Sequence, residues 1–331
     1  MLNKSESEYN PQFTVRLLLP ISKIRDQLKI ENCQLQTTSF NKIVSVLIFT
    51  LCFAMNSNAQ SSLIAEGAKL NLVSDQFAFT EGPAVDNKGN IFFTDQPNDR
   101  IWKYSNKGKL SLYMEPAGRA NGLFFDAKGN LIACADGDNE LWRISKKKTH
   151  EVLAKNWDDK RFNGPNDVWI HASGGMYFTD PFYKRKYWKH TEMEQLEQRL
   201  FYRSPSGEIS IAADGFTQPN GLVGKDNTLF VTDIRGQKTY KFDIQPDGKL
   251  TNKKLFCEQG SDGMTIDEQG NLYLVGKGVT IYNPAGEVIG GIDVPENWTA
   301  NITFGGKKRQ TLFITASKSV YTIDMKVKGT Q

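Results

Sequence analysis

Short apolar stretches alternate with polar turns from about residue 80 to the C-terminus. One unit recurs: a polar residue, usually followed by Gly, then an apolar stretch, a polar turn that often ends in Gly-Asn, and a second apolar stretch. The six copies are EGPAVDNKGNIFFTD from Glu81, NGLFFDAKGNLIACAD from Asn121, NDVWIHASGGMYFTD from Asn166, NGLVGKDNTLFVTD from Asn220, DGMTIDEQGNLYLV from Asp262 and NITFGGKKRQTLFITA from Asn301. Two apolar segments joined by a Gly-containing turn are typical of a β-hairpin. The pattern therefore predicts six hairpins.

The spacing of the copies indicates how the hairpins assemble. Their first residues are 40, 45, 54, 42 and 39 positions apart, close to the roughly 40–50 residues of a propeller blade. Further strand-like runs at 101–104, 141–144 and 200–203 supply outer strands. Sustained helical periodicity is missing, apart from a helix-compatible segment at 192–199. We predict an all-β fold, a six-bladed β-propeller with four strands in each blade.

The longest interval between copies contains an insertion, residues 182–199, in the third blade. It carries Tyr183, Tyr187, Trp188 and His190 ahead of the charged, helix-compatible part. Long loops in compact domains are often functional. A solvated surface excursion and a substrate lid both remain open interpretations.

The N-terminal part has a different character. Residues 42–59 combine one basic residue, an apolar run at 43–54 and the small-residue ending Ser57-Asn58-Ala59, which is typical of a signal peptide cleaved after Ala59. The apolar run is shorter than the roughly 20 residues of a membrane span, and a buried core helix is the alternative. We expect residues 1–41 to be an unassigned extension, and residues 60–331 to form the propeller of an exported, periplasmic or extracellular protein.

Composition and charge exclude few classes of function. The 331 residues are 39% hydrophobic and 24% charged with a formal net charge of +4, which is ordinary for a soluble globular protein. Since no dense basic run is interleaved with aromatics, nothing indicates a nucleic-acid partner. Cys134 and Cys257 lie in apolar stretches without C-x-x-C spacing, so we expect buried free thiols. Oligomeric state is not encoded in these features.

The first residues of the six copies become a ring, because equivalent positions of successive blades are related by rotation about the central axis. The ring would contain Glu81, Asn121, Asn166, Asn220, Asp262 and Asn301, each with a side-chain oxygen. Asn-Gly and Asp-Gly are also common hairpin turns, which is the competing interpretation. Glu81 in register with the others, and Asn166-Asp167 without a glycine, favour the ring.

Two carboxylates with several amide oxygens suit a hard divalent cation, and Ca²⁺ takes 6–8 oxygen ligands in flexible geometry. Calcium is therefore the first choice, with Mg²⁺ and Mn²⁺ as oxygen-binding alternatives. Zn²⁺ is disfavoured, because its sites usually contain His or Cys and all three histidines lie outside the ring.

The motifs EGP at Glu81, RFNGPNDV at Arg161, TDPFY at Thr179, PNGL at Pro219 and SDGM at Ser261 resemble those of gluconolactonase, senescence marker protein (regucalcin) and related bacterial lactonases, and more distantly the paraoxonases. The resemblance covers about residue 70 to the C-terminus. It implies metal ligands at Glu81, Asn166, Asn220 and Asp262, with Asp262 also the catalytic acid/base, and substrate contacts at Arg161 and Asn163. Asp167 remains a candidate ligand, and the family's substrate glutamates have no secure counterpart in the insertion.

The chemistry expected from this set is metal-dependent hydrolysis of a sugar-type lactone. The cation would polarise the carbonyl and Asp262 would act as general base on water. No G-x-S-x-G nucleophile motif is present. An esterase or phosphotriesterase on the same metal site is one alternative. A non-catalytic propeller that holds calcium and binds sugar or protein is the other.

Overall fold

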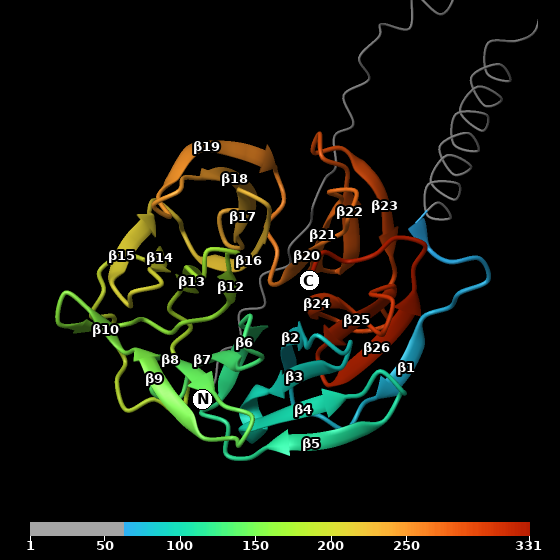
Figure 1. Ribbon diagram of the computed structural model, residues 1–331, viewed down its shortest axis with the longest axis horizontal. Coiled ribbons are helices and arrows are strands. Elements are labelled where there is room, and N and C mark those ends of the chain that lie inside the picture. The colour runs from blue at the N-terminus through green and yellow to red at the C-terminus, as the bar shows by residue number, and fades with distance from the viewer. Residues whose placement is uncertain (1–62) are drawn as a thin grey trace, which may run out of the picture. The chain divides into compact units, whose positions relative to one another are not determined.

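The computed structural model describes residues 63–331. The expected N-terminal extension (1–41) and signal peptide (42–59) lie outside the described residues. Within the described range, no helix is long and apolar enough to cross a membrane. Strands dominate, and they form six four-stranded antiparallel sheets arranged around a common centre (Figure 1). The predicted six-bladed β-propeller is confirmed.

The first three blades follow one another along the chain, each running from the innermost to the outermost strand. Blade 1 contains β2 (Thr80–Val85), β3 (Ile91–Asp95), β4 (Arg100–Tyr104) and β5 (Leu110–Met114). Blade 2 contains β6 (Ala120–Phe125), β7 (Leu131–Ala135), β8 (Glu140–Ile144) and β9 (His150–Ala154). Blade 3 contains β12 (Val168–Ile170), β13 (Met176–Asp180), β14 (Arg199–Arg203) and β15 (Ile209–Ala213).

The remaining blades repeat this order until the last one. Blade 4 contains β16 (Pro219–Lys225), β17 (Thr228–Asp233), β18 (Lys238–Ile244) and β19 (Leu250–Cys257). Blade 5 contains β20 (Met264–Ile266), β21 (Leu272–Gly276), β22 (Gly278–Tyr282) and β23 (Val288–Ile292). Blade 6 contains β24 (Thr299–Gly305), β25 (Thr311–Ala316), β26 (Ser319–Asp324) and β1 (Asn71–Ser74).

Two elements were not predicted from the sequence. β1 pairs with β26 although the two are separated by almost the whole domain, so the first strand completes the last blade and closes the ring. A small extra hairpin, β10 (Asn156–Trp157) with β11 (Lys160–Arg161), precedes blade 3. Between β3 and β4 lies a short 3₁₀ turn, η1 (Gln96–Asn98).

The inner hairpins owe their turns to a recurring aspartate. Asp86 Oδ1 accepts backbone N–H bonds from Lys88 and Asn90, both at 2.9 Å, while Asn90 Nδ2 donates to Asp86 Oδ2 at 2.7 Å. The same network recurs in blades 2 and 5, around Asp126 with Asn130 and Asp267 with Asn271. Such aspartate turns pre-form the chain reversal, which explains the Asp…Gly-Asn pattern of the repeat.

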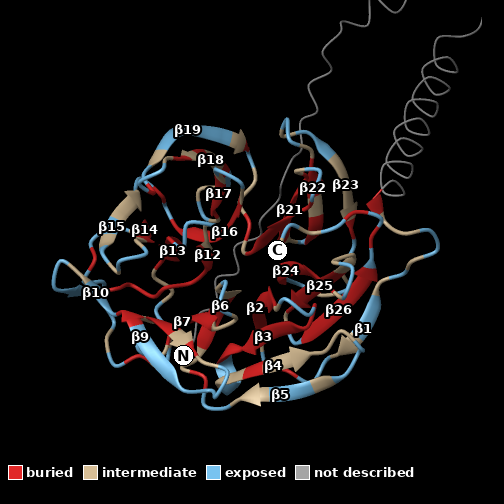
Figure 2. Ribbon diagram, viewed as in Figure 1, coloured by how far each residue is buried: buried red, intermediate tan, exposed pale blue. Residues whose placement is uncertain are grey.

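The core lies between the blades. The inner and middle strands are buried, whereas outer strands such as β9 and β19 are exposed (Figure 2). One apolar cluster joins Trp169, Leu222 and Met264 from three successive blades. Because each hairpin buries apolar side chains on both faces against its neighbours, a single blade would not be stable alone. Cys134 and Cys257 are buried free thiols, as expected.

The helix-compatible segment of the insertion does not form a helix. The helix-compatible segment 192–198 is irregular, and Arg199 already begins β14. Its polar side chains are used for contacts with other segments: Gln195 Nε2 donates to the carbonyls of Trp157 and Lys160 at 2.9 and 2.8 Å, and Glu194 pairs with Arg161. These tertiary contacts outweigh the local helix propensity.

Candidate active site

The six ring residues lie on or directly before the innermost strands. Glu81, Asn121, Asn220 and Asn301 are within β2, β6, β16 and β24, whereas Asn166 and Asp262 shortly precede β12 and β20. Adjacent blades touch there through backbone hydrogen bonds, from Gly122 N to Asn166 O at 2.7 Å and from Gly263 N to Ala300 O at 2.8 Å. The inner strands thus bring these positions together at the centre of the molecule (Figure 1).

The glycines after the ring residues serve packing rather than turns. A Cβ on Gly82 would lie 2.0 Å from the Asn121 carbonyl oxygen, and one on Gly263 would lie 2.0 Å from Asn301 Cγ. The Asn121-Gly122 pair lies inside β6, so the hairpin-turn interpretation is wrong for it. In four blades the strand register shifts at or next to the ring residue, and such bulges re-aim a side chain.

Asn220 and Asp262 are in direct contact. Asn220 Nδ2 donates to Asp262 Oδ1 at 2.7 Å and to the phenol oxygen of Tyr183 at 2.5 Å. This orientation of the amide follows from its neighbour, since a carboxylate can only accept. Both amide hydrogens are therefore used, and Asn220 Oδ1 has no hydrogen bond from a described residue. Trp298 Nε1 donates to the other carboxylate oxygen of Asp262, Oδ2, at 2.6 Å.

Glu81 and Asn166 complete the predicted ligand set. Glu81 Oε2 accepts from Gly82 N at 2.9 Å and from Asn301 Nδ2 at 3.3 Å, so its Oε1 has no hydrogen bond within residues 63–331. The Asn166 side chain is 5% exposed and makes no hydrogen bond to the described part of the chain. No side-chain contact there joins Asn166 to the other three residues.

Burial raises the pKa values of the ring carboxylates and of the neighbouring Asp167. Burial, together with the neighbouring Asp262 carboxylate, raises the pKa of Glu81 well above its ordinary value. Burial raises the pKa of Asp262 to about 6, against the hydrogen bonds from Trp298 and Asn220 that lower it. Burial likewise raises the pKa of Asp167 to about 7, and Asp167 Oδ1 accepts the N–H of Val168 at 3.0 Å.

A divalent cation fits this donor set. Within residues 63–331, neither Glu81 nor Asp262 forms an ion pair with a basic side chain, and buried carboxylates without a counter-charge are costly. The same range contains no group of three or more His, Cys, Asp or Glu side chains placed to bind a metal. The fit therefore rests on two carboxylates combined with amide oxygens, which suits Ca²⁺ more than Zn²⁺.

Arg161 and Asn163 are positioned differently from the ring. Arg161 is on β11 and pairs with Glu194 at 2.9 Å. Asn163 is 1% exposed; its backbone N–H donates to Asp180 Oδ2 at 2.9 Å and its Nδ2 to the Glu197 carbonyl at 3.1 Å. No hydrogen bond or ion pair links either residue to Glu81, Asn220 or Asp262 in the described chain. Their assignment as substrate contacts stays a prediction.

The insertion reaches the ring, which the sequence did not predict. Tyr183 contacts Asn220, and the guanidinium of Arg185 lies 4.8 Å from the centre of the Tyr183 ring. Asp136, directly after β7, holds the segment: its Oδ2 accepts from Arg185 Nε at 2.9 Å and from the Tyr187 hydroxyl, and its carbonyl accepts from Trp188 Nε1 at 2.6 Å. Burial raises the pKa of Tyr183, so its phenol stays protonated.

Asp136 departs from a repeated structural role. In three blades the aspartate that ends the second strand caps the loop before the first strand: Asp95, Asp180 and Asp233 each accept two backbone N–H bonds, at 2.8–3.2 Å. Blade 2 has Ala135 at this register position, and Asp136 follows it. That irregularity in the second repeat was the one sequence signal for the contact with the insertion.

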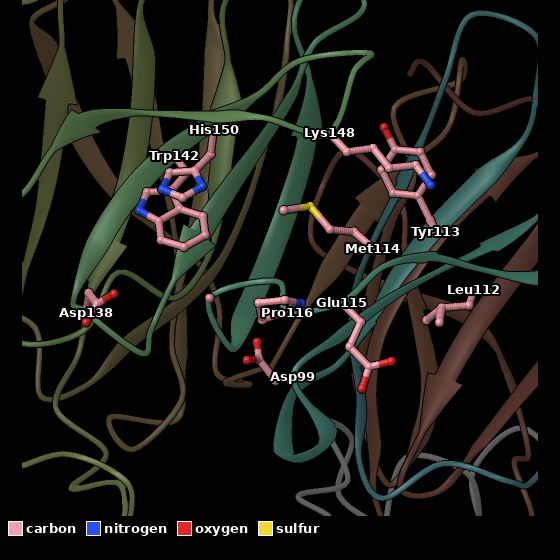
Figure 3. A pocket seen from close by; sticks show the side chains of 11 residues that line it. Asp99, Leu112, Tyr113, Met114, Glu115, Pro116, Asp138, Trp142, Lys148 and His150 are labelled. Carbon is pink, nitrogen blue, oxygen red and sulfur yellow. The ribbon is translucent and has the colours of Figure 1, made fainter.

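A large cavity lies away from the ring. A volume of about 730 Å³ lies between the outer strands of blades 1 and 2, and its lining includes Tyr113, Trp142, Lys148 and His150 (Figure 3). None of the six ring residues lines it. His150 stacks on Trp142 with ring centres 3.7 Å apart, and Lys148 Nζ lies 5.1 Å above Tyr113. Because the protein's own side chains cover these aromatic faces, this cavity is not the candidate active site.

Comparison with known proteins agrees with this geometry. Residues 79–318 match the model of the SMP-30/Gluconolactonase/LRE-like region. The chain is 29% identical over 293 residues to a gluconolactonase of Zymomonas mobilis subsp. mobilis, covering 78% of this chain and 82% of that one. A solved gluconolactonase of Xanthomonas campestris superposes with a TM-score of 0.73 at 25% identity, covering 80% and 91%.

A more remote relative carries the name of a different activity. The diisopropyl-fluorophosphatase of the squid Loligo vulgaris is 25% identical over 182 residues, covering 50% of this chain and 58% of that protein. The family model nevertheless spans most of the propeller, from the start of blade 1 into the last blade. The chain belongs to the SMP-30/gluconolactonase/LRE-like family.

Proposed function

We propose that the protein is a metal-dependent lactone hydrolase that acts on sugar-type lactones. The observation that carries this proposal is a pair of carboxylates without a basic partner in the described chain, the buried Glu81 and the half-buried Asp262, next to the free amide oxygen of Asn220. Its family relatives named gluconolactonase support the substrate class. Glu81, Asn166, Asn220 and Asp262 would hold the cation, with Ca²⁺ as first choice and Mg²⁺, Mn²⁺ or Zn²⁺ as alternatives. Once bound, the cation would supply a Lewis acid that polarises the ester carbonyl.

Asp262 acts as the general base in this proposal. Burial raises the pKa of Asp262 to about 6 in the metal-free protein, which makes this carboxylate a stronger base than an exposed aspartate. Trp298 and Asn220 each fix one of its oxygens, so the carboxylate is held in one orientation. It takes a proton as the water oxygen bonds to the carbonyl carbon. The ring C–O bond then breaks, and the leaving alkoxide oxygen recovers that proton.

The test is hydrolysis of glucono-δ-lactone in a pH-stat, corrected for spontaneous hydrolysis. The protein is assayed after EDTA treatment and again with Ca²⁺, Mg²⁺, Mn²⁺ or Zn²⁺ restored. Asp262→Asn is compared with Asp243→Asn, which changes an aspartate on β18, outside the ring. We expect metal-dependent turnover that Asp262→Asn reduces by at least about 100-fold. Turnover that survives both EDTA and Asp262→Asn would refute the mechanism.

The squid relative favours one second candidate, phosphotriester hydrolysis at the same cation. A chromogenic phosphotriester in the same assay distinguishes the two activities through the ratio of kcat/KM values. A folded protein that binds calcium but turns over neither substrate would instead support a non-catalytic propeller, since the fold itself does not dictate function.

We also propose that the protein is exported. The support is the sequence of residues 42–59, with its apolar run and its small residues before position 60. Expression in a bacterial host followed by N-terminal sequencing tests this. A mature protein that begins at Gln60 agrees with export through a signal peptide. Recovery of the whole chain uncleaved in the cytoplasm contradicts it.

A further inference from the structure

The hydrogen of the Tyr183 phenol has no acceptor among the described residues. Tyr183 Oη already accepts a hydrogen bond from Asn220 Nδ2 at 2.5 Å, so its own hydrogen points away from that amide. The adjacent carboxylates, Asp262 and Glu81, interact with the phenol electrostatically without a hydrogen bond. A phenol donor thus stands free beside the candidate metal ligands.

The insertion keeps this donor in place from two sides. Asn220 Nδ2 donates to the phenol oxygen. The guanidinium of Arg185 lies 4.8 Å from the centre of the Tyr183 aromatic ring, and Arg185 Nε donates to Asp136 Oδ2 at 2.9 Å. Asp136 and Arg185 are 3% and 23% exposed at their side chains. A donor held by several elements loses little rotational freedom when substrate binds, and such pre-organised donors are effective where negative charge develops.

We propose that Tyr183 is a further catalytic residue, which donates its phenolic hydrogen to the carbonyl oxygen of the lactone as negative charge develops there. This inference rests on the proposed function. Asn220 connects the phenol to the candidate cation site, because its Nδ2 donates to the phenol oxygen while its free Oδ1 is available to the cation. If the substrate carbonyl oxygen binds that cation, the phenol would lie beside this oxygen rather than beside the hydroxyl groups of the lactone.

No proton is transferred from Tyr183 in this step. The water proton goes to Asp262, the electron pair of the carbonyl moves onto its oxygen, and Tyr183 stabilises that charge through a hydrogen bond. The phenol therefore acts alongside the cation as a second electrophilic group. Its contribution grows as the oxygen becomes more negative, so its removal lowers kcat more than it raises KM.

The experiment compares Tyr183→Phe with wild type and with Tyr113→Phe. Tyr113 lines the cavity between blades 1 and 2, and its hydroxyl has no hydrogen bond to a described residue, so this control removes the same atom away from the ring (Figure 3). Each protein is assayed on glucono-δ-lactone and on δ-valerolactone, which lacks the hydroxyls. Calcium affinity is measured by calorimetry. The carbonyl stretch of the ¹³C-labelled lactam analogue of glucono-δ-lactone, bound to calcium-loaded protein, is measured by difference infrared spectroscopy.

We expect Tyr183→Phe to lower kcat about 100-fold on both lactones, the lower end of the range for a single oxyanion donor, with calcium affinity changed by less than about twofold. The carbonyl band of the bound lactam should shift to higher frequency in Tyr183→Phe and stay at the wild-type frequency in Tyr113→Phe. An unchanged kcat and carbonyl band would overturn the inference, and so would a loss confined to glucono-δ-lactone or a matching loss of calcium affinity. Wild type inactive on both lactones would overturn the proposed function, and this inference with it.

Discussion

Replacement of Asp136 by asparagine should release the insertion from the propeller. The substitution keeps the size of the side chain and the backbone carbonyl that binds Trp188, but it removes the charge that faces Arg185. The amide oxygen of asparagine can still face Arg185, Tyr187 and Gln96, which all donate to Asp136 Oδ2 now, but a neutral oxygen accepts more weakly than a carboxylate. The Arg185 cation loses its counter-charge.

The magnitude follows from burial. Breaking a buried ion pair by removing one partner typically costs about 3–5 kcal/mol. Arg185 is 23% exposed, so water screens part of this loss and about 2–3 kcal/mol is the appropriate range. Since 1.4 kcal/mol corresponds to a factor of ten, the locally open population of the insertion should rise by roughly 30- to 100-fold. The β-ladders of the six blades are not touched, so global stability in urea should change much less.

Limited trypsin digestion measures this opening, because Lys184, Lys186 and Lys189 are exposed within the insertion. Under conditions where closing is faster than cleavage, the cutting rate reports the open population. Asp138→Asn is the matched control, since Asp138 is exposed in the same turn and its side chain makes no hydrogen bond to the described chain. Cleavage after these lysines at the same rate in Asp136→Asn, Asp138→Asn and wild type would refute the reasoning.

Two further predictions concern Gly221 in β16 and Asp180 at the end of β13. Gly221→Ala should destabilise the protein by about 1–3 kcal/mol in urea denaturation and weaken calcium binding in calorimetry, because the new Cβ would lie 2.4 Å from the Asp262 carbonyl oxygen; unchanged calcium affinity would contradict this. Burial raises the pKa of Asp180 from 3.8 to about 7, so the folded state holds that proton more tightly and loses stability as pH rises through this interval. The stability advantage of wild type over Asp180→Asn should therefore shrink between pH 4.5 and pH 8, by up to about 3 kcal/mol, and an advantage that grows would contradict it.

The sequence carried the fold because the repeat is local. Each inner hairpin is encoded within about 15 residues, with an aspartate such as Asp86 that closes its own turn through N–H groups two and four residues away. The period between copies then fixed the number of blades. The closing strand β1 could not be found in this way. Its partner β26 comes from the other end of the domain, and β1 has no copy of the repeat around it.

In the candidate site, too, residues within the repeat could be predicted and residues outside it could not. The six ring positions could be predicted because rotation about the propeller axis converts a sequence period into a ring, whereas the choice of Glu81, Asn166, Asn220 and Asp262 as metal ligands came from the family resemblance and stays a prediction. Tyr183 belongs to no period, and Asp136 ends the second copy one position out of register, so this irregularity was the only local signal for the contact between the insertion and the propeller. The motif around Arg161 suggests a substrate contact, and in the structure Arg161 pairs with Glu194 of the insertion, so that assignment stays a prediction.

The insertion therefore links three blades at the ring. It leaves blade 3 after β13, contacts blade 2 through Asp136, and reaches blade 4 through the Tyr183–Asn220 hydrogen bond. A rigid propeller presents the same polar ring whatever its substrate, so a wall that discriminates among esters has to come from a segment outside the repeat. Because that segment is tied to the propeller by side-chain hydrogen bonds and by the ion pairs of Arg185 with Asp136 and of Glu194 with Arg161, its sequence can change without altering the blades. Differences in substrate among proteins with this ring should thus follow the insertion residues around Tyr183, such as the one at the position of Arg185, more closely than residues of the ring itself.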